Sequence, residues 1–543
     1  MNNKKMSLIK STNTTTLSVI SLVGFFFIFR LALALCTGLG TGESYYFRGA
    51  YDVALSYLDQ PPLFFWLSHL SLKLFGLNTL ALRLPDVILF SGTTWVLFLL
   101  ARQLFNEKSA LYTVIIFNLS AVYVIDGIWF QPDAPLLFFW AVSLYVLAKI
   151  FFPRKEGESG KFELDNSDPG KSDSDKSDSG KPKLFWLWVL LGVGIGLTGL
   201  SKYHVVFFFC GMVLFILTRQ IKLLKHPGLY MAFIICGLFF LPILIWNYQH
   251  DWISIKFQSS RAVAQPDFTL HFDWFLRSFV GQALWLLPWI WIPIVYEFIR
   301  SYKLGKTDQK YWFFFCMALF PIVFFTLATL WADLSYHFHW QSVGYMILFI
   351  PLGATIAKKV ESGSRRLIKR WLWLSGIFLY ALLIVAAFQV QTGFWQKYGP
   401  KQLNMSVNST VSQSNIIDPT MDSYDYTDLL TYFERNRLLQ QSGGSGKFVG
   451  VSNWLLAGKV DWALKGKIPV RSFEERRNYI YYFNDEDYLG QDVIFITRDD
   501  EEKAFSDVQD NCSNFKKLDD VPITRKGKVE LVLHLYTCQN FHI

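Results

Sequence analysis

The sequence predicts a polytopic α-helical membrane protein that carries a soluble α/β domain at its C-terminus. Hydrophobic residues make up 52% of the 543-residue chain and aromatic residues 18%, with 51 Phe and 20 Trp. This composition is typical of helices that face lipid and of the aromatic belts at their ends. Most of the positive charge behind the formal net charge of +9 lies in short loops, where it can set topology. The charge therefore does not indicate nucleic acid binding.

Apolar runs long enough to cross a bilayer are the first observation behind this prediction. The first run, at 17–35, has no small-residue cleavage site, so we expect a span and not a cleaved signal. Ten more runs bring the expected number of spans to about eleven. They cover 86–104, 109–125, 134–152, 184–200, 203–218, 229–246, 275–299, 311–331, 341–357 and 371–391.

The distribution of positive charge is the second observation. A cytoplasmic N-terminus places about twenty-five Lys and Arg on one side and only about seven in the opposite loops, as the positive-inside rule expects. The loop at 153–183 then lies inside and, being polar and of low complexity, should be disordered. The domain at 392–543 lies outside, and the membrane domain covers 1–391.

The outer loop at 38–84 is unusually polar for a membrane loop. It contains GESYYF at 42–47 and SYLDQPPLFFWL at 56–67. We expect one short helix over about 44–57 and a second from Pro61 to Gly76, because proline tolerates a first helical turn and glycine ends a helix. At about 14 residues the second helix is too short to span, so it should lie in the membrane interface.

The third observation is the change to soluble composition after 392. Helices are expected at 425–440 and 454–465, and strands at 448–452, 493–497 and 529–536, an order that fits a small α/β domain. The GGSGK at 443–447 does not complete a phosphate loop, because Gln441 stands at its first glycine position. Cys512 and Cys538 form a disulfide if this domain faces an oxidising compartment.

Polar residues that are rare in membrane proteins collect on the predicted outer face: Glu43, Asp59, Asp133, Lys202, His250 and His339. Taken singly, each residue also has a purely structural interpretation. The aspartates before prolines can be helix caps, the lysine can be a side chain that reaches the membrane interface, and the histidines beside tryptophans can belong to the aromatic belt. Together, carboxylates can orient or deprotonate an acceptor or hold a divalent cation, and a lysine can neutralise a lipid phosphate. Histidine with carboxylates also suits zinc or manganese. Spacing leaves these roles open.

Several motifs in series resemble the bacterial integral-membrane glycosyltransferases of family 39, the ArnT-like and PMT-like proteins. Besides the two loop motifs they are RLPD at 83–86, QPDAPLLFFW at 131–140, LSKYH at 200–204, WNYQHDW at 246–252 and HW at 339–340. The resemblance covers roughly residues 20–355 and implies a GT-C glycosyltransferase fold in the bacterial inner membrane. It also implies an inverting transfer from a polyprenyl-phosphate-linked sugar donor to a periplasmic lipid or glycan acceptor, such as lipid A, lipopolysaccharide or another cell-envelope glycolipid.

The resemblance also implies roles for individual residues. Glu43, Asp59 and Asp133 fall on catalytic acids, and Lys202 with Tyr203 on the donor-phosphate site. Substrate contacts are expected from Tyr45, Tyr46, His250 and His339. If a divalent metal (zinc, manganese or magnesium) is required, Asp59 and His250 are its expected ligands. One departure matters, because the family's usual catalytic aspartate is glycine here, at Gly42.

Two other functions stay open at this point. A protein O-glycosyltransferase on the same fold would differ only in its acceptor. A transporter or flippase of lipid-linked sugars belongs to another class, but transporters carry internal repeats and mid-membrane polar residues. Here the acids collect at one interface.

Overall fold

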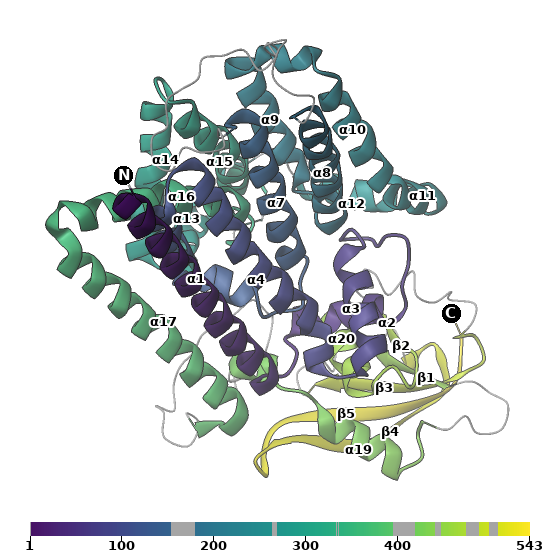
Figure 1. Cartoon of the computed structure of the whole chain (residues 1–543). Coiled ribbons are helices and arrows are strands. Elements are labelled where there is room, and N and C mark those ends of the chain that lie inside the picture. Colours follow the sequence, from purple (N-terminus) through teal and green to yellow (C-terminus); the bar gives the residue numbers. More distant parts are fainter. Residues whose placement is uncertain are drawn as a thin grey trace.

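The computed structural model describes residues 2–153, 180–262, 269–332, 334, 336–394, 419–439, 447–473, 488–498 and 509–542. A helical bundle joins a smaller sheet domain at one end (Figure 1). Most of the loop at 153–183 and of the GGSGK segment lies outside the described residues. The bundle helices are α1 Asn2–Cys36, α4 Thr79–Leu104, α5 Glu107–Phe117, α6 Ala121–Asp126, α7 Asp133–Phe151, α8 Gly180–Ser201, α9 Val205–Arg219, α10 Pro227–Phe239, α11 Leu241–Gln249, α12 Ile253–Ala262, α13 Phe272–Leu286, α14 Pro288–Gly305, α15 Gln309–Leu327, α16 Ser342–Lys359 and α17 Arg365–Thr392.

The predicted apolar runs lie mostly in these helices, but several are broken. In the described chain six helices are long and apolar enough to cross a membrane, or up to eight if each bent pair is one span. The run at 275–299 turns by 108° between α13 and α14, at Leu287, whose φ is 73° and which precedes Pro288. Proline cannot continue a helix without losing a hydrogen bond. The span expected at 275–299 is therefore sharply bent, and the count of about eleven spans is not confirmed.

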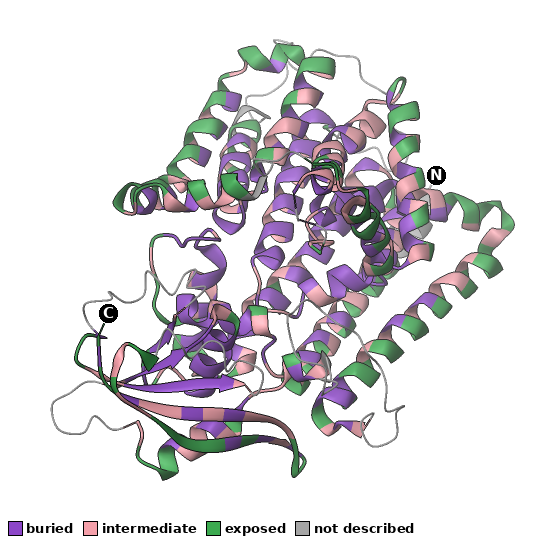
Figure 2. Cartoon of the chain, turned by 180° about the vertical axis from the view of Figure 1, so that it is seen from behind, coloured by how far each residue is buried: buried purple, intermediate pink, exposed green. Residues whose placement is uncertain are grey.

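Burial follows the pattern of a membrane bundle. Figure 2 shows buried residues in the middle of the bundle and exposed residues along its outer helices. Many of the exposed residues are large and apolar, such as Ile234 on α10 and Leu367, Trp373 and Ile377 on α17. Apolar surface of this extent is what lipid covers. The structure confirms a helical, multi-pass membrane architecture.

Two short helices lie between α1 and α4, as the sequence predicts, but the first begins about three residues earlier and ends six residues earlier than the expected 44–57. Helix α2 covers Thr41–Tyr51 and α3 covers Leu63–Phe75. Helix α3 begins after Pro61 and Pro62 and ends at Gly76, whose φ of 79° suits glycine. Leu63 of α3 packs with Leu200 and Ile243 of the bundle. These contacts hold the outer loop against α8 and α11.

The C-terminal domain is built on one mixed sheet of order β2-β1-β3-β5-β4. Strands β2, β1 and β3 are parallel, and β5 pairs antiparallel with β3 and β4. Cys512 on β4 and Cys538 on β5 form a disulfide, which confirms that prediction. The elements are η4 Pro419–Ser423, α19 Thr427–Arg435, β1 Lys447–Val451, α20 Trp454–Ala463, β2 Val470–Ser472, β3 Asp492–Arg498, β4 Cys512–Arg525 and β5 Lys528–Phe541.

Helix α20 connects β1 to β2 and lies against α2, so the outer loop sits between the sheet and the bundle (Figure 1). The sequence predicts α20, β1, β3 and β5 within a few residues. It misses β2, a strand of three residues, and β4, whose charged face has no clear alternation.

Candidate active site

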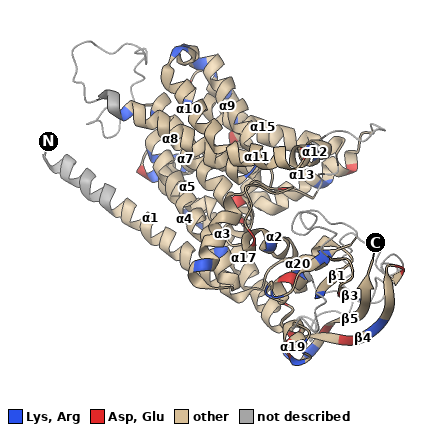
Figure 3. Ribbon diagram, turned by 90° about the vertical axis from the view of Figure 1, so that its right-hand side faces the viewer, with Lys and Arg blue, Asp and Glu red and all other residues tan. Residues whose placement is uncertain are grey.

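Charged side chains gather where the bundle meets the outer loop. Figure 3 shows mostly uncharged helices, with Lys, Arg, Asp and Glu near α2, α3 and α20 and at the opposite end of the bundle. Ionisable residues buried in a membrane protein are costly and usually mark function. The junction of the bundle with α2 and α3 is therefore the candidate site.

Glu43 in the first turn of α2 is fully hydrogen-bonded. Its Oε1 accepts from Arg83 Nε at 2.7 Å and from the Phe130 amide at 2.8 Å. Its Oε2 accepts from Arg83 Nη2 at 2.6 Å and from the Gly40 amide at 2.8 Å. Both side chains of the ion pair are at most 1% exposed. A bidentate pair with every lone pair engaged fixes geometry well.

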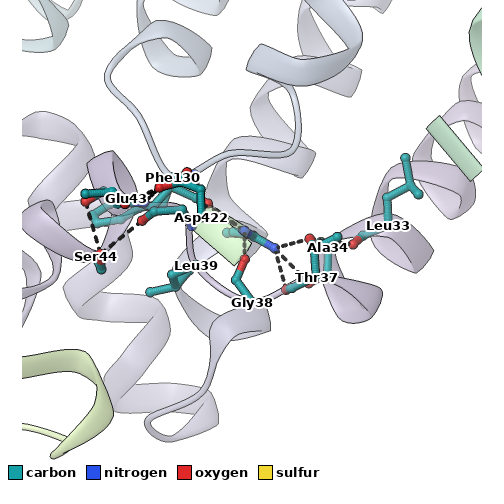
Figure 4. A network of polar contacts seen from close by, with 12 residues as sticks. Leu33, Ala34, Thr37, Gly38, Leu39, Glu43, Ser44, Phe130 and Asp422 are labelled. Atoms are coloured by element: carbon teal, nitrogen blue, oxygen red, sulfur yellow. Dashed lines mark hydrogen bonds and ion pairs between the residues drawn. The ribbon is translucent and has the colours of Figure 1, made fainter. Parts of the chain in front are cut away.

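Arg83 uses its remaining N–H groups to hold the end of α1. Nη1 donates to the carbonyl oxygens of Ala34 at 3.1 Å and Thr37 at 2.9 Å, and Nη2 donates to that of Gly38 at 2.7 Å. The Ala34 carbonyl lies in the last turn of α1, where carbonyls lack a partner within the helix, and Thr37 and Gly38 follow the end of that helix. Figure 4 shows this network around Glu43. Arg83 thus ties α1, α2 and α4 together.

Asp133 and Lys202 form the second buried ion pair. Asp133 begins α7, and Lys202 follows the end of α8. Lys202 Nζ lies 2.9 Å from Asp133 Oδ1 and 3.0 Å from Oδ2, and the two side chains are 6% and 2% exposed. Because Phe130 is held by Glu43, the turn leading into Asp133 is also fixed. The predicted residues Glu43, Asp133 and Lys202 therefore belong to one connected network.

Two buried acids in this region were not predicted. Asp86, one turn beyond Arg83, accepts from the Gln131 amide and interacts electrostatically with Glu43 and Asp133. Asp126 at the end of α6 interacts with Asp133 and Lys202, and burial raises its pKa well above the usual value. In the described part of the chain, one carboxylate oxygen of each has no hydrogen-bond partner. Charges inside or next to apolar runs were the signal that could have found them.

His339 faces the Asp133–Lys202 pair from the turn before α16. Removal of its ring from water lowers its pKa to about 4, with Lys202 acting in the same direction and Asp133 opposing. A histidine with this pKa is neutral at physiological pH. His339 is therefore uncharged there, and Lys202 supplies the positive charge.

Asp59 and Tyr203 also come together. The hydroxyl of Tyr203 lies 2.8 Å from Ser254 Oγ, and burial together with the Asp59 charge raises its pKa. Gln258 Nε2 donates to the Asp59 carbonyl oxygen at 2.6 Å. Since Tyr203 follows Lys202, the outer loop reaches the second ion pair through Asp59. Tyr46, in the same loop, accepts from Gln60 Nε2 at 3.3 Å.

Tyr45 and His250 lie in other surroundings. The ring of Tyr45 packs 4.7 Å from Trp454 of α20 and belongs to the core of the sheet domain. His250 stacks on Trp246 at 4.1 Å, and its Nδ1 lies 2.8 Å from the Trp246 carbonyl oxygen. Their predicted contacts with substrate stay predictions.

A metal centre is not apparent in the described residues. Among them, no group of three or more His, Cys, Asp or Glu is placed to hold a metal ion. A metal held by Asp59 and His250 stays a prediction, and no chemical step is assigned to one.

Comparisons with known proteins show which proteins the chain resembles in sequence and fold. Residues 59–156 match the family model of dolichyl-phosphate-mannose-protein mannosyltransferase. The lipid A galacturonosyltransferase RgtD of Rhizobium johnstonii is 21% identical over 269 residues, 49% of this chain and 50% of that protein. Undecaprenyl phosphate-alpha-4-amino-4-deoxy-L-arabinose arabinosyl transferase 2 of Proteus mirabilis is 21% identical over 359 residues, 62% of this chain and 56% of that protein. The chain thus spans about half the length of these two curated relatives.

Solved structures show the fold over nearly the whole chain. The apo crystal structure of ArnT from Cupriavidus metallidurans superposes with a TM-score of 0.63 and 12% identity, covering 96% of this chain and 98% of that one. The structure of the same protein bound to undecaprenyl phosphate gives a TM-score of 0.57 and 11% identity, with the same coverage. The chain therefore has the GT-C fold of ArnT and is similar in sequence to bacterial glycosyltransferases.

Proposed function

We propose that the protein is an inverting glycosyltransferase of the bacterial inner membrane. It moves a sugar from a polyprenyl-phosphate donor to lipid A, lipopolysaccharide or another envelope glycolipid at the periplasmic face. The observation that carries the proposal is the buried Lys202–Asp133 pair beside the outer loop. The relative RgtD, a lipid A galacturonosyltransferase, supports a sugar transfer to lipid A. The arabinosyl transferase, named for an undecaprenyl-phosphate-linked sugar, and the ArnT complex with undecaprenyl phosphate support a polyprenyl-phosphate donor.

The pair suits a leaving phosphate. An acceptor oxygen attacks the anomeric carbon, the bond from that carbon to the phosphate oxygen breaks, and polyprenyl phosphate departs with the electron pair. Negative charge grows on the phosphate during this step, and a preorganised cation stabilises it. Lys202 is buried, and Asp133 holds its ammonium group in place before the donor arrives. Tyr203 is the adjacent hydroxyl for a phosphate oxygen.

Deprotonation of an acceptor hydroxyl requires a base, and the carboxylates of the site differ in how well they suit this role. Glu43 already accepts four hydrogen bonds, so we assign it a positioning role through Phe130. Asp59 is a loop carboxylate that interacts electrostatically with Tyr203, and we assign it the contact with the acceptor. A phosphate oxygen of lipid A is already ionised and needs no strong base, which is compatible with glycine at position 42.

Transfer with purified protein tests the function. The protein is incubated with a labelled polyprenyl-phosphate sugar and lipid A, and the products are separated by mass. We expect labelled lipid A from wild type, and strongly reduced transfer from Asp133→Asn and Asp59→Asn. Absence of transfer to any envelope lipid, with a donor that a related transferase accepts, contradicts the proposal.

A protein O-glycosyltransferase is the second candidate, because the matching family model is a protein mannosyltransferase. Membranes incubated with labelled donor distinguish the two acceptors. Label in the lipid fraction supports the first function, and label in the protein fraction supports the second. A flippase would move the donor across the membrane with its sugar–phosphate bond intact.

A further inference from the structure

The first turn of helix α2, which contains Glu43, contacts the bundle. The rest of α2 contacts helix α20 of the sheet domain. We propose that the sheet domain contributes to the transfer site. Asp461 and Lys459 of α20 position α2, and α2 in turn positions the Glu43–Phe130 contact. This inference rests on the proposed function and gives the C-terminal domain a role in it.

A buried ion pair forms the centre of the contact. Arg48 Nε of α2 donates to Asp461 Oδ2 at 2.7 Å, and Arg48 Nη2 is bonded to Asp461 Oδ1. Asp461 is 0% exposed and Arg48 4%. A planar guanidinium that meets a carboxylate through two bonds fixes both distance and orientation. The pair therefore sets the rotation of α2 against α20.

Lys459, one half-turn earlier on α20, holds the chain that enters α2. Its Nζ donates to the Leu39 carbonyl at 2.5 Å, and also to the carbonyl oxygens of Asp422 and Tyr424. The Leu39 amide in turn donates to Asp425 Oδ1 at 3.0 Å. Both backbone groups of Leu39 are thus bound by the sheet domain, four residues before Glu43.

The close approach of the two helices depends on a glycine. A Cβ placed at Gly458 would lie 2.5 Å from the Tyr45 amide nitrogen and 2.6 Å from its Cα. Neither atom can move away as a flexible side chain would. Glycine permits such backbone contact because it has no side chain. The Tyr45 ring then packs on Trp454 of the same helix.

Helix α2 also connects this contact with the sheet domain to the candidate site. Glu43 lies five residues before Arg48 and accepts the Phe130 amide at 2.8 Å, three residues before Asp133. A shift of α2 would therefore move the turn that places Asp133 beside Lys202. Displacements of about 1 Å can lower a rate by about 10²-fold. Among the described residues, Asp461 hydrogen-bonds to Arg48 of α2 and to none of the predicted site residues, so we expect its effect on the reaction to pass through α2.

The test compares full-length variants in lipid nanodiscs with the transfer assay. Asp461→Asn removes the charge of the buried pair, and the reciprocal variant Arg48→Asp/Asp461→Arg restores it in reverse. Asp422→Ala removes an exposed acceptor of the Thr41 amide and leaves the sheet core intact. The matched control is Glu434→Gln, which breaks the exposed Lys467–Glu434 pair of the same domain. Thermal unfolding checks the fold of each variant.

We expect Asp461→Asn to lower kcat by about 10- to 100-fold with donor KM nearly unchanged. The reciprocal variant should regain much of this loss, and Glu434→Gln should match wild type. Should Asp461→Asn fail to fold, a lower kcat at unchanged KM in Asp422→Ala supports the proposal. Folded variants with wild-type kcat overturn it while leaving the function standing. An inactive wild type overturns the function itself.

Discussion

At the scale of single residues, the site separates positioning charges from a reactive cation. Glu43 accepts hydrogen bonds from four donors. Arg83 donates to three carbonyl oxygens in addition to Glu43, so neither side chain has hydrogen-bonding capacity left for substrate. Among the described residues, the Lys202 ammonium group donates only to the two oxygens of Asp133. An ammonium group with three protons can exchange or share one partner with an arriving phosphate.

Replacing Lys202 by methionine should abolish this electrostatic role while keeping the apolar stem. We expect kcat/KM to fall by about 10²- to 10³-fold, the cost of losing one preorganised donor to a developing charge. Initial rates of sugar transfer measure it. Lys73→Met is the control, because Lys73 is exposed on α3 of the same outer loop. Equal rates in both variants would argue against Lys202 as the phosphate ligand.

Gly42 offers a second experiment at this scale. A Cβ there would meet no atom within 4 Å, and the residue is exposed in the first turn of α2. Gly42→Asp should fold at least as stably as wild type, since an acid suits a helix N-terminus and glycine does not suit a helix interior. We expect an unchanged rate with lipid A, because its phosphate oxygen is already ionised. A marked rise would show instead that a base at position 42 is missing.

His339 should make stability depend on pH. Its pKa is about 4 in the folded chain and near 6.5 in the unfolded chain, so the unfolded state binds the proton first as the pH falls. Stability should therefore decrease between pH 6.5 and 4 and be unaffected above pH 6.5. Melting temperatures of wild type and His339→Gln across this range measure the effect. Curves that stay parallel would contradict a buried, neutral His339.

At the scale of elements, Arg83 is the hub of the outer end of the bundle. It joins the last carbonyls of α1 to the first turn of α2, and its own helix α4 also carries Asp86. Buried pairs contribute little net stability when intact, but breaking one leaves an uncompensated charge. The junction of α1, α2 and α4 therefore keeps its geometry only when both Arg83 and Glu43 are present.

Arg83→Met should destabilise the bundle by about 3–5 kcal/mol. Adding Glu43→Gln should recover part of that loss, because the stranded charge is gone. Unfolding in detergent followed by a double-mutant cycle measures the coupling. The control is Lys108→Met in the exposed Lys108–Glu361 pair, where we expect at most about 1 kcal/mol. Additive losses would argue against a direct Arg83–Glu43 interaction.

At the scale of the whole molecule, the sheet domain lies at the end of the bundle where the site residues meet. That placement puts both on the same side of the membrane (Figure 1). The Cys512–Cys538 bond belongs in an oxidising compartment, which agrees with the proposed periplasmic orientation.

The oxidation state of the cysteines tests this orientation in cells. We expect Cys512 and Cys538 to resist thiol alkylation until a reductant is added, whereas the exposed Cys36 reacts directly. Mass spectrometry of the alkylated peptides provides the measurement. Cys512→Ser/Cys538→Ser should lower the stability of the sheet domain by about 2–4 kcal/mol. Free, reactive thiols in the wild-type protein would place the domain in a reducing compartment.

Some of these features follow from local sequence. The helix after Pro61-Pro62, its end at Gly76, and strands β1, β3 and β5 rest on turn chemistry and short-range periodicity. Breaks such as the one at Leu287 were missed because average hydropathy does not register backbone geometry. The partners of Glu43 were also missed, since Arg83 is 40 residues away in the chain and Phe130 is 87.

The sequence by itself determined that this chain is a helical membrane protein with an outer loop rich in acids, because hydropathy and charge act residue by residue. Only the tertiary structure decided how those acids are used. It paired Glu43 with Arg83 and Asp133 with Lys202, and it joined α2 to the sheet domain through Asp461. Partners of a buried charge are set by packing between distant segments, and no local pattern in the chain records them.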